Sequence, residues 1–382
     1  MTHNPIKIPL VDLSLQHQPI QTKIEQAIAQ VIQKGDFILG QKLAEFQSAF
    51  ATACGVKYGI GVASGTDAIS LGLQACGILP GDEILVPANT FIATIIGIIR
   101  ANATPVLVDC HPETALIDLT AIETAITSKT KAIIPVHLYG QMVSPNQLLH
   151  LAKTYNLIIF EDAAQAHLAE REGYRAGSFS QAAAFSFYPS KNLGAFGDGG
   201  MLVTNDREIA QKMQIFRNYG APQKYLHTEI GTNSRLDTLQ AAILNVKLPY
   251  LESWNHSRNL AAQYYNELLD PLKAKGIFPI QNQSSSGNIY HLYVIRVTEK
   301  SPINRDLLQE KLAVAGIQTG IHYPIPCHLQ PAYPNLGNLG DFPHTETLCK
   351  QILSLPIYPG ISNTQIQQVV ATIKLALLTV NC

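Results

Sequence analysis

The chain of 382 residues carries 27 basic and 28 acidic side chains, and 46% of its residues are hydrophobic. This balance of charge excludes the basic surface that non-specific binding to nucleic acid or to an anionic membrane requires. Only 14% of the residues are charged, against about 25% in average soluble proteins. We therefore expect a large core, one large or two ordinary domains, and an interface between subunits.

Residues 58 to 204 predict a mostly parallel β-sheet. Short apolar, β-branched runs alternate there with helix-length segments such as 66–77 and 144–155, which is typical of a sheet covered by helices on both faces. The expected strands span 58–63, 83–87, 105–109, 131–137, 157–161, 183–187 and 199–204. The fold class is therefore α/β, with three layers.

The pattern changes after Asp237 to long helices, followed by a serine-rich break at 283–287. Strands at 290–297 and 317–323 and helices near 304–315, 343–353 and 363–378 then predict a smaller α+β unit. We expect a large domain over 1–250, including the N-terminal segment, and a small C-terminal domain over 251–382.

The six cysteines form no CxxC pair and have no histidine at metal-ligand spacing, so we expect neither a zinc site nor a disulfide framework. The first residues lack the apolar core of a signal peptide, and the most apolar later stretch ends after nine residues at Arg100. We expect a cytoplasmic protein without a membrane-spanning segment.

In a parallel sheet, ligands bind beyond the carboxyl ends of the strands, and polar residues follow most of the strands here. Ser64, Gly65 and Thr66 lie where a strand turns into a helix, so backbone N–H groups, two hydroxyls and the positive helix end are available to a phosphate. The alternative is an ordinary helix cap formed by Ser64 or Thr66.

The same segment nearly matches a dinucleotide-binding glycine loop, through Gly59, Gly61 and Gly65. Such loops need an acidic residue at the end of the second strand to hold the ribose, and residues 87–89 read Pro-Ala-Asn. A nicotinamide-dependent dehydrogenase is therefore the weaker hypothesis.

Two residues suggest pyridoxal chemistry. Asp162 ends the apolar strand LIIFED, where a carboxylate is able to keep a heteroaromatic nitrogen protonated; a helix cap is the alternative. Lys191 lies in the nearly charge-free loop FSFYPSKNLGAFGDGG, where desolvation would lower its pKa and free its amine to react with a carbonyl. Ser186 and Tyr188 precede it, and Phe91, after another strand, would cover a planar ring or pack in the core.

The segments SGTDA, PANTFIAT, VHLYGQ, EDAAQAH, FSFYPSKNLGAFGDGG and GTNSRLDTLQAAIL resemble the DegT/DnrJ/EryC1/StrS family of pyridoxal-phosphate-dependent sugar aminotransferases, from about residue 8 to 378. The resemblance implies the fold of aspartate aminotransferase (fold type I) and a homodimer with active sites shared between subunits.

The resemblance also implies roles for single residues. Lys191 would form the Schiff base, Asp162 would pair with the pyridinium nitrogen, Gln165 would contact the 3-hydroxyl side and Phe91 would stack on the ring. Gly65, Thr66 and Ser186 are expected to hold the phosphate, together with Ser64, and Asn233 to reach it from the neighbouring subunit. The cofactor would alternate between pyridoxal and pyridoxamine phosphate.

The implied reaction moves an amino group, from L-glutamate, to a keto carbon of a nucleotide-linked deoxysugar. The segments RNYGAPQKYLH and GIHYPIPCHLQPAYPNLG favour a 3-keto-6-deoxyhexose linked to thymidine diphosphate, with Tyr188, His322 and Tyr323 in the sugar pocket. Aminotransferases for 4-keto sugars or UDP-linked 3-keto sugars remain alternatives. Leu168 stands where the family has a small residue, which predicts a narrower pocket. A regulatory protein that keeps the fold without turnover is the alternative from another class.

Overall fold

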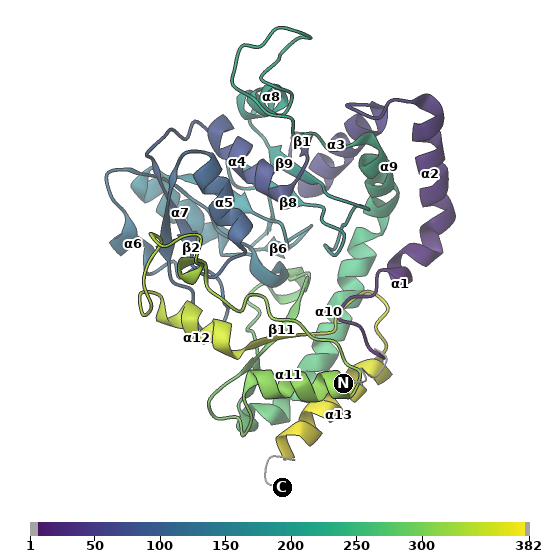
Figure 1. The fold of residues 1–382 in the computed structure, drawn as a ribbon, viewed down its shortest axis with the longest axis vertical. Helices are drawn as coiled ribbons and strands as arrows, with labels where there is room; N and C mark the ends of the chain where they lie inside the picture. The colour runs from purple at the N-terminus through teal and green to yellow at the C-terminus, as the bar shows by residue number, and fades with distance from the viewer. Residues whose placement is uncertain (1–6, 379–382) are drawn as a thin grey trace.

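The structure, a computed structural model, describes residues 7–378. A seven-stranded sheet lies at its centre (Figure 1), in the order β1-β9-β8-β5-β4-β2-β3. Its strands are β1 (Tyr58–Val62), β2 (Glu83–Pro87), β3 (Thr104–Val108), β4 (Thr130–Ile133), β5 (Ile158–Asp162), β8 (Ala182–Ser186) and β9 (Gly200–Thr204). Strand β9 runs antiparallel to both of its neighbours, and the other strand pairs are parallel. The predicted mostly parallel α/β sheet is confirmed.

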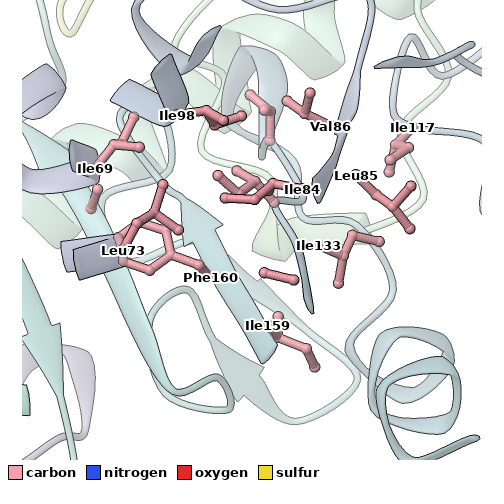
Figure 2. Packing of buried hydrophobic residues seen from close by; sticks show 14 of the residues in the cluster. Ile69, Leu73, Ile84, Leu85, Val86, Ile98, Ile117, Ile133, Ile159 and Phe160 are labelled. Atoms are coloured by element: carbon pink, nitrogen blue, oxygen red, sulfur yellow. The ribbon is translucent and has the colours of Figure 1, made fainter. Parts of the chain in front are cut away.

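Helices cover both faces of this sheet because successive side chains of a strand point in opposite directions. On β9, Leu202 packs into one hydrophobic cluster and its neighbours Met201 and Val203 pack into another. The helices around the sheet are α3 (Gln41–Cys54), α4 (Gly65–Ala75), α5 (Ile92–Arg100), α7 (Pro145–Tyr155), α8 (Arg207–Phe216) and α9 (Thr238–Lys247), and α2 (Gln21–Lys34) packs on α9. Figure 2 shows the first cluster, in which Ile69 and Leu73 of α4 meet Phe160 of β5.

Local signals set where these helices begin and end. Ser144 caps α7 by accepting a hydrogen bond from the backbone N–H of Gln147, and Pro145 occupies the first turn, where a missing N–H costs nothing. Asn156 ends the same helix in the left-handed conformation, at φ +54°. The chain then enters β5 directly, which delivers Asp162 to the carboxyl edge of the sheet.

A second, three-stranded antiparallel sheet consists of β10 (Ile277–Pro279), β11 (Tyr293–Val297) and β12 (Ile352–Leu355). The helices α10 (Leu251–Leu269), α11 (Arg305–Val314) and α13 (Asn363–Leu378) pack on it, with α12 (Pro343–Gln351) leading into β12. In Figure 1, α11 and α13 lie together at the end of the molecule remote from α8. Ile8, near the start of the chain, also packs into this second core. The boundary at residue 250 stays a prediction.

One predicted strand is wrong. Segment 317–323 forms only two isolated bridges, from Ile317 to Ile8 and from Gly320 to Ser354. The third strand of the small sheet is instead Ile352–Leu355, whose first two residues the sequence pattern assigned to the end of a helix over 343–353. Among the described residues, no helix is long and apolar enough to cross a membrane.

Candidate active site

A cavity of about 480 Å³ opens at the carboxyl edge of the parallel strands. Residues that come directly after five of the seven central strands line this cavity. Strand β9 runs in the opposite direction, so residues just before its start line the cavity as well. The residues predicted from the sequence that line it are Ser64, Gly65, Thr66, Phe91, Asp162, Gln165, Ser186, Tyr188, Lys191, His322 and Tyr323. The fold thus brings together eleven of the twelve predicted site residues, the exception being Asn233.

The N-terminus of α4 forms an anion cradle in this cavity. Ser64 caps the helix by accepting from the backbone N–H of Asp67 at 3.1 Å, as the alternative interpretation expected. Gly65 and Thr66 begin the helix and line the cavity, where unsatisfied N–H groups are available to a phosphate. A Cβ atom at Gly65 would lie 2.8 Å from the Cβ of Ser186, so the helix end approaches β8 more closely than any other residue permits.

Asp162 is 5% exposed and keeps its carboxylate in a network of donors. Oδ1 accepts from the backbone N–H of Ala164 at 3.1 Å, and Oδ2 accepts from the hydroxyl of Thr94 at 2.7 Å. Burial raises the pKa of Asp162, whereas the two hydrogen bonds and the nearby Lys191 act in the opposite direction. A cationic N–H group in the cavity would therefore be a favourable partner for this carboxylate.

Lys191 stands in a tight loop between β8 and β9. Its backbone N–H donates to Tyr188 O at 2.9 Å, and Ala195 N–H donates to Phe187 O at 2.8 Å. Gly194 fits this loop because a Cβ there would lie 2.2 Å from Pro189 O. Burial lowers the pKa of Lys191 to about 8, against the opposing charge of Asp162. A larger fraction of this amine is therefore neutral near neutral pH than in an ordinary lysine, and the neutral form is the nucleophile.

Polar and aromatic groups form the opposite wall. Gln165 Oε1 accepts from Tyr139 N–H at 2.7 Å, and its Nε2 donates to the Tyr323 hydroxyl at 3.2 Å. The Tyr323 ring lies 5.2 Å from the ring of Phe91, which is half exposed at the cavity and free to cover a planar ligand. Burial and the nearby Lys191 lower the pKa of His322 to about 4, so this imidazole is neutral at neutral pH.

Asn233 lies outside the cavity of its own chain. Its side chain is exposed, and its backbone bridges to Asn218. The adjacent Ser234 accepts from Ala63 N–H at 3.1 Å and donates to Asp67 at 2.8 Å, so this segment is fixed against the start of α4. The expectation that Asn233 reaches the cofactor phosphate of a neighbouring subunit therefore stays a prediction.

Leu168 does not narrow the cavity, and that prediction is wrong. The residue adopts φ +64° and is 8% exposed, and it packs in the cluster that includes Phe50 and Ile289. It is not among the residues that line the cavity.

Sequence reasoning missed several residues of the site. Thr94 lies in the first turn of α5, and its only signal was its place shortly after a strand end. His291 and Leu292 come from the segment before β11 of the small domain, and Ser190 and Asp198 come from the lysine loop. His291 had no signal, because only the packing of the segments around the three-stranded sheet on the large sheet brings it to the cavity.

Two other features do not compete with this site. A wider depression of about 1030 Å³ lies beside β10 and is lined by Glu113, Lys273, Arg296 and Lys300, among others; it shares no lining residue with the cavity. Within residues 7–378, no group of three or more histidine, cysteine or acidic residues is placed to hold a metal ion.

A buried lysine with a lowered pKa, a buried carboxylate and an anion cradle at one edge of an α/β sheet are the groups expected in an enzyme that uses pyridoxal phosphate. The residues fit the cofactor: the cradle at Gly65 fits a phosphate, Asp162 fits a ring N–H, and the amine of Lys191 fits an aldehyde.

Comparisons with known proteins agree with this class. The model of the DegT/DnrJ/EryC1/StrS aminotransferase family matches residues 18–374. A dTDP-3-amino-3,6-dideoxy-alpha-D-galactopyranose transaminase of Aneurinibacillus thermoaerophilus is 45% identical over 96% of this chain and 99% of its own. A pleiotropic regulatory protein of Geobacillus stearothermophilus is 42% identical over 96% and 98%. The crystal structure of DesV from S. venezuelae superposes with a TM-score of 0.93 at 41% identity, over 98% and 99% of the chains.

The chain therefore belongs to the DegT/DnrJ/EryC1/StrS aminotransferase family. The resemblance predicted from its motifs is confirmed, as are the aminotransferase activity and the pyridoxal phosphate cofactor.

Proposed function

We propose that this enzyme transfers the amino group of L-glutamate to the keto carbon of a nucleotide-linked deoxysugar, of the dTDP-3-keto-6-deoxyhexose type. The observation that carries the proposal is the pairing of Lys191, whose pKa is lowered, with the buried Asp162 in one cavity of about 480 Å³. The name of the Aneurinibacillus relative, 45% identical, supports the sugar class.

Each of these residues has a defined role in the proposed site. When bound, pyridoxal phosphate supplies an aldehyde and a ring that accepts electrons from the amino-bearing carbon. Lys191 would hold the cofactor through its neutral amine, and its Nζ would carry the proton to and from the substrate. Asp162 accepts the N–H of the ring nitrogen and keeps it protonated. The start of α4 and Ser186 bind the phosphate.

The remaining predicted residues position the ring and the substrate. Gln165 is fixed by Tyr139 and Tyr323, so it presents one side of its amide to the 3-hydroxyl group of the cofactor. Phe91 covers the ring. Tyr188, His322 and Tyr323 bind the sugar, and the neutral His322 does so without attracting an anion.

We further propose that the enzyme is a cytoplasmic homodimer in which Asn233 of one subunit contacts the cofactor phosphate of the other. The exposure of Asn233 and of several large apolar side chains nearby supports an interface, among them Phe37, Tyr219, Leu226 and Ile230. The free cysteines of the described chain fit a reducing compartment.

The decisive experiment records the near-ultraviolet and visible absorption of the protein reconstituted with pyridoxal phosphate, before and after L-glutamate. A band of lysine-bound cofactor that glutamate converts to that of pyridoxamine phosphate, and that Lys191→Ala lacks, is expected. Addition of keto-sugar nucleotides should restore the first band. A 4-keto or a UDP-linked 3-keto sugar that restores it faster would replace the sugar assignment within the same family.

A regulatory protein is the second candidate, favoured by the name of the Geobacillus relative. It predicts that the cofactor band forms and that neither glutamate nor other amino donors change it. A glutamate-dependent change in the wild-type protein excludes this candidate.

A further inference from the structure

A line of hydrogen bonds runs from a backbone carbonyl to the wall of the cavity through two buried asparagines. Asn255 Nδ2 donates to His167 O at 2.9 Å, and Asn192 Nδ2 donates to Asn255 Oδ1 at 2.8 Å. Asn192 Oδ1 then lies 3.2 Å from Nδ1 of His291. Asn192 immediately follows Lys191 in the sequence, and both Lys191 and His291 line the cavity.

The direction of every bond in this line is fixed by its backbone ends. A carbonyl oxygen only accepts, so His167 O orients the amide of Asn255 and leaves Asn255 Oδ1 as an acceptor. Asn192 Nδ2 also donates to Ile289 O at 3.1 Å, which orients the second amide in the same way. Asn192 Oδ1 therefore accepts from His291, whose proton must be on Nδ1 and whose Nε2 carries a lone pair.

This imidazole is held rigidly and in its neutral form. His291 is 8% exposed and lines the cavity, and within residues 7–378 its Nε2 has no hydrogen-bond partner. Arg258 Nη1 donates to His291 O at 3.3 Å and to Tyr290 O at 3.2 Å, which fixes the backbone. Burial, with the positive charge of Lys191, keeps the pKa of His291 well below its usual value.

We propose that His291 is a further substrate-binding residue, whose unprotonated Nε2 accepts a hydrogen bond from a hydroxyl group of the acceptor sugar. This deepens the proposed function and rests on it. The cavity must receive two substrates in turn, an amino dicarboxylate and a sugar. A fixed lone pair repels a carboxylate and attracts a hydroxyl, so His291 contributes to the sugar half-reaction and not to the glutamate half-reaction.

The test compares the two half-reactions in His291→Phe and in His291→Gln, whose side-chain oxygen is still able to accept. Loss of one neutral hydrogen bond should lower the specificity constant for the keto-sugar nucleotide by about 3- to 10-fold more than that for glutamate in the Phe variant, and by less in the Gln variant. Equal losses in both half-reactions, or none in either, would overturn the proposal. Absence of a glutamate half-reaction in the wild type would instead refute the proposed function.

A spectroscopic readout tests the tautomer without activity. In holoenzyme labelled with ¹⁵N-histidine, the signals absent from His291→Gln identify His291. We expect a protonated Nδ1 and a non-protonated Nε2 that persist down to pH 6, and an Nε2 resonance that shifts when the sugar nucleotide binds. A protonated Nε2, or an imidazolium at pH 7, would overturn the proposal. Thermal unfolding monitored by circular dichroism shows that both variants fold.

Discussion

The hydroxyl of Thr94 donates a hydrogen bond to Oδ2 of Asp162 at 2.7 Å, and both side chains are buried. Because the Thr94 proton points to the carboxylate, the hydroxyl of Thr90, 2.7 Å away, must donate to Thr94. Two hydroxyls in series thus stabilise a carboxylate whose pKa burial raises. This chain, together with the backbone N–H of Ala164 and the charge of Lys191, favours the ionised form of Asp162.

We predict that Thr94→Val moves the acidic limb of the pH profile of kcat toward higher pH. The variant removes a donor that favours the charged carboxylate, so the pKa of Asp162 rises further above its usual value. Turnover at neutral pH should fall about 3- to 10-fold. Thr94→Ser keeps the donor and serves as the control. Identical profiles for the wild type and the Val variant would show that the hydroxyl does not support Asp162.

Asp162→Asn should make the cofactor-free protein more stable while turnover falls by about 10²-fold or more. In the folded state the pKa of Asp162 lies above its usual value of 3.8. As the pH rises above 3.8, the folded state therefore binds more protons than the unfolded state. The ionised carboxylate therefore lowers the free energy of unfolding above that pH. Asp162→Asn has no ionisable group at this position, so its free energy of unfolding is not lowered in this way. Urea unfolding of the two apoproteins at pH 4 and pH 8 should show an advantage for the variant only at pH 8.

Reconstitution with pyridoxal phosphate should become faster as pH rises toward about 8 and then level off, because only the neutral amine of Lys191 attacks the aldehyde. Stopped-flow absorption of the apoprotein mixed with cofactor measures this rate. A rate that continues to rise toward pH 10 would indicate a lysine with its ordinary pKa. Lys191→Ala should give no covalent product at any pH and unfold at the temperature of the wild type.

The central sheet and most of the site were predictable because both depend on local patterns. Apolar runs mark the strands, and the polar residues that follow them, such as Asp162 and Ser186, reach one edge by topology alone. Loop glycines and the charge-free context marked Lys191. Each of these patterns spans only a few residues, so it is recognisable in the sequence without knowledge of the fold.

Contacts between distant segments were not predictable. His291 reaches the cavity only because α10 and the small sheet pack beside the large one, and Arg258 and Asn192 then fix it. The misassigned segment 317–323 has a strand-like pattern, but its neighbours are Ile8 and Ser354, more than 30 residues away in each direction. Pairing at such separations is set by the whole fold.

Lys247, at the end of α9, is 1% exposed and contacts the loop between β8 and β9 that carries Lys191. Its Nζ donates to Gly194 O and lies 3.0 Å from His17 Nε2. Burial lowers its pKa from 10.5 to about 8, so between these values the unfolded state binds more protons and the folded state gains stability as pH rises. Lys247→Met should abolish this rise in stability with pH and leave Gly194 O without its donor. We expect the lost hydrogen bond to lower the free energy of unfolding by about 1–3 kcal/mol.

Urea unfolding at pH 7.5 and pH 10 measures this effect as the difference between Lys247→Met and the wild type, which should be larger at pH 10. Lys153→Met, on the exposed side of α7, is a matched control that should differ little at either pH. A difference that stays constant with pH would show that the amine of Lys247 titrates as in the unfolded chain.

Mixing two inactive variants should restore activity if the sites are shared between subunits. Asn233→Asp places a negative charge where we propose that the partner's cofactor phosphate binds, and Lys191→Ala removes the amine. In a hybrid dimer, the subunit that keeps Lys191 receives an intact Asn233 from the other chain, so one of its two sites is complete. Random refolding makes half of the dimers hybrids, which predicts recovery of about one quarter of the wild-type activity.

If Asn233 acted within its own chain, every site in the hybrid would lack one of the two groups and no activity would return. Asn233→Ser, which removes the amide without adding charge, should be impaired less than Asn233→Asp in the unmixed state.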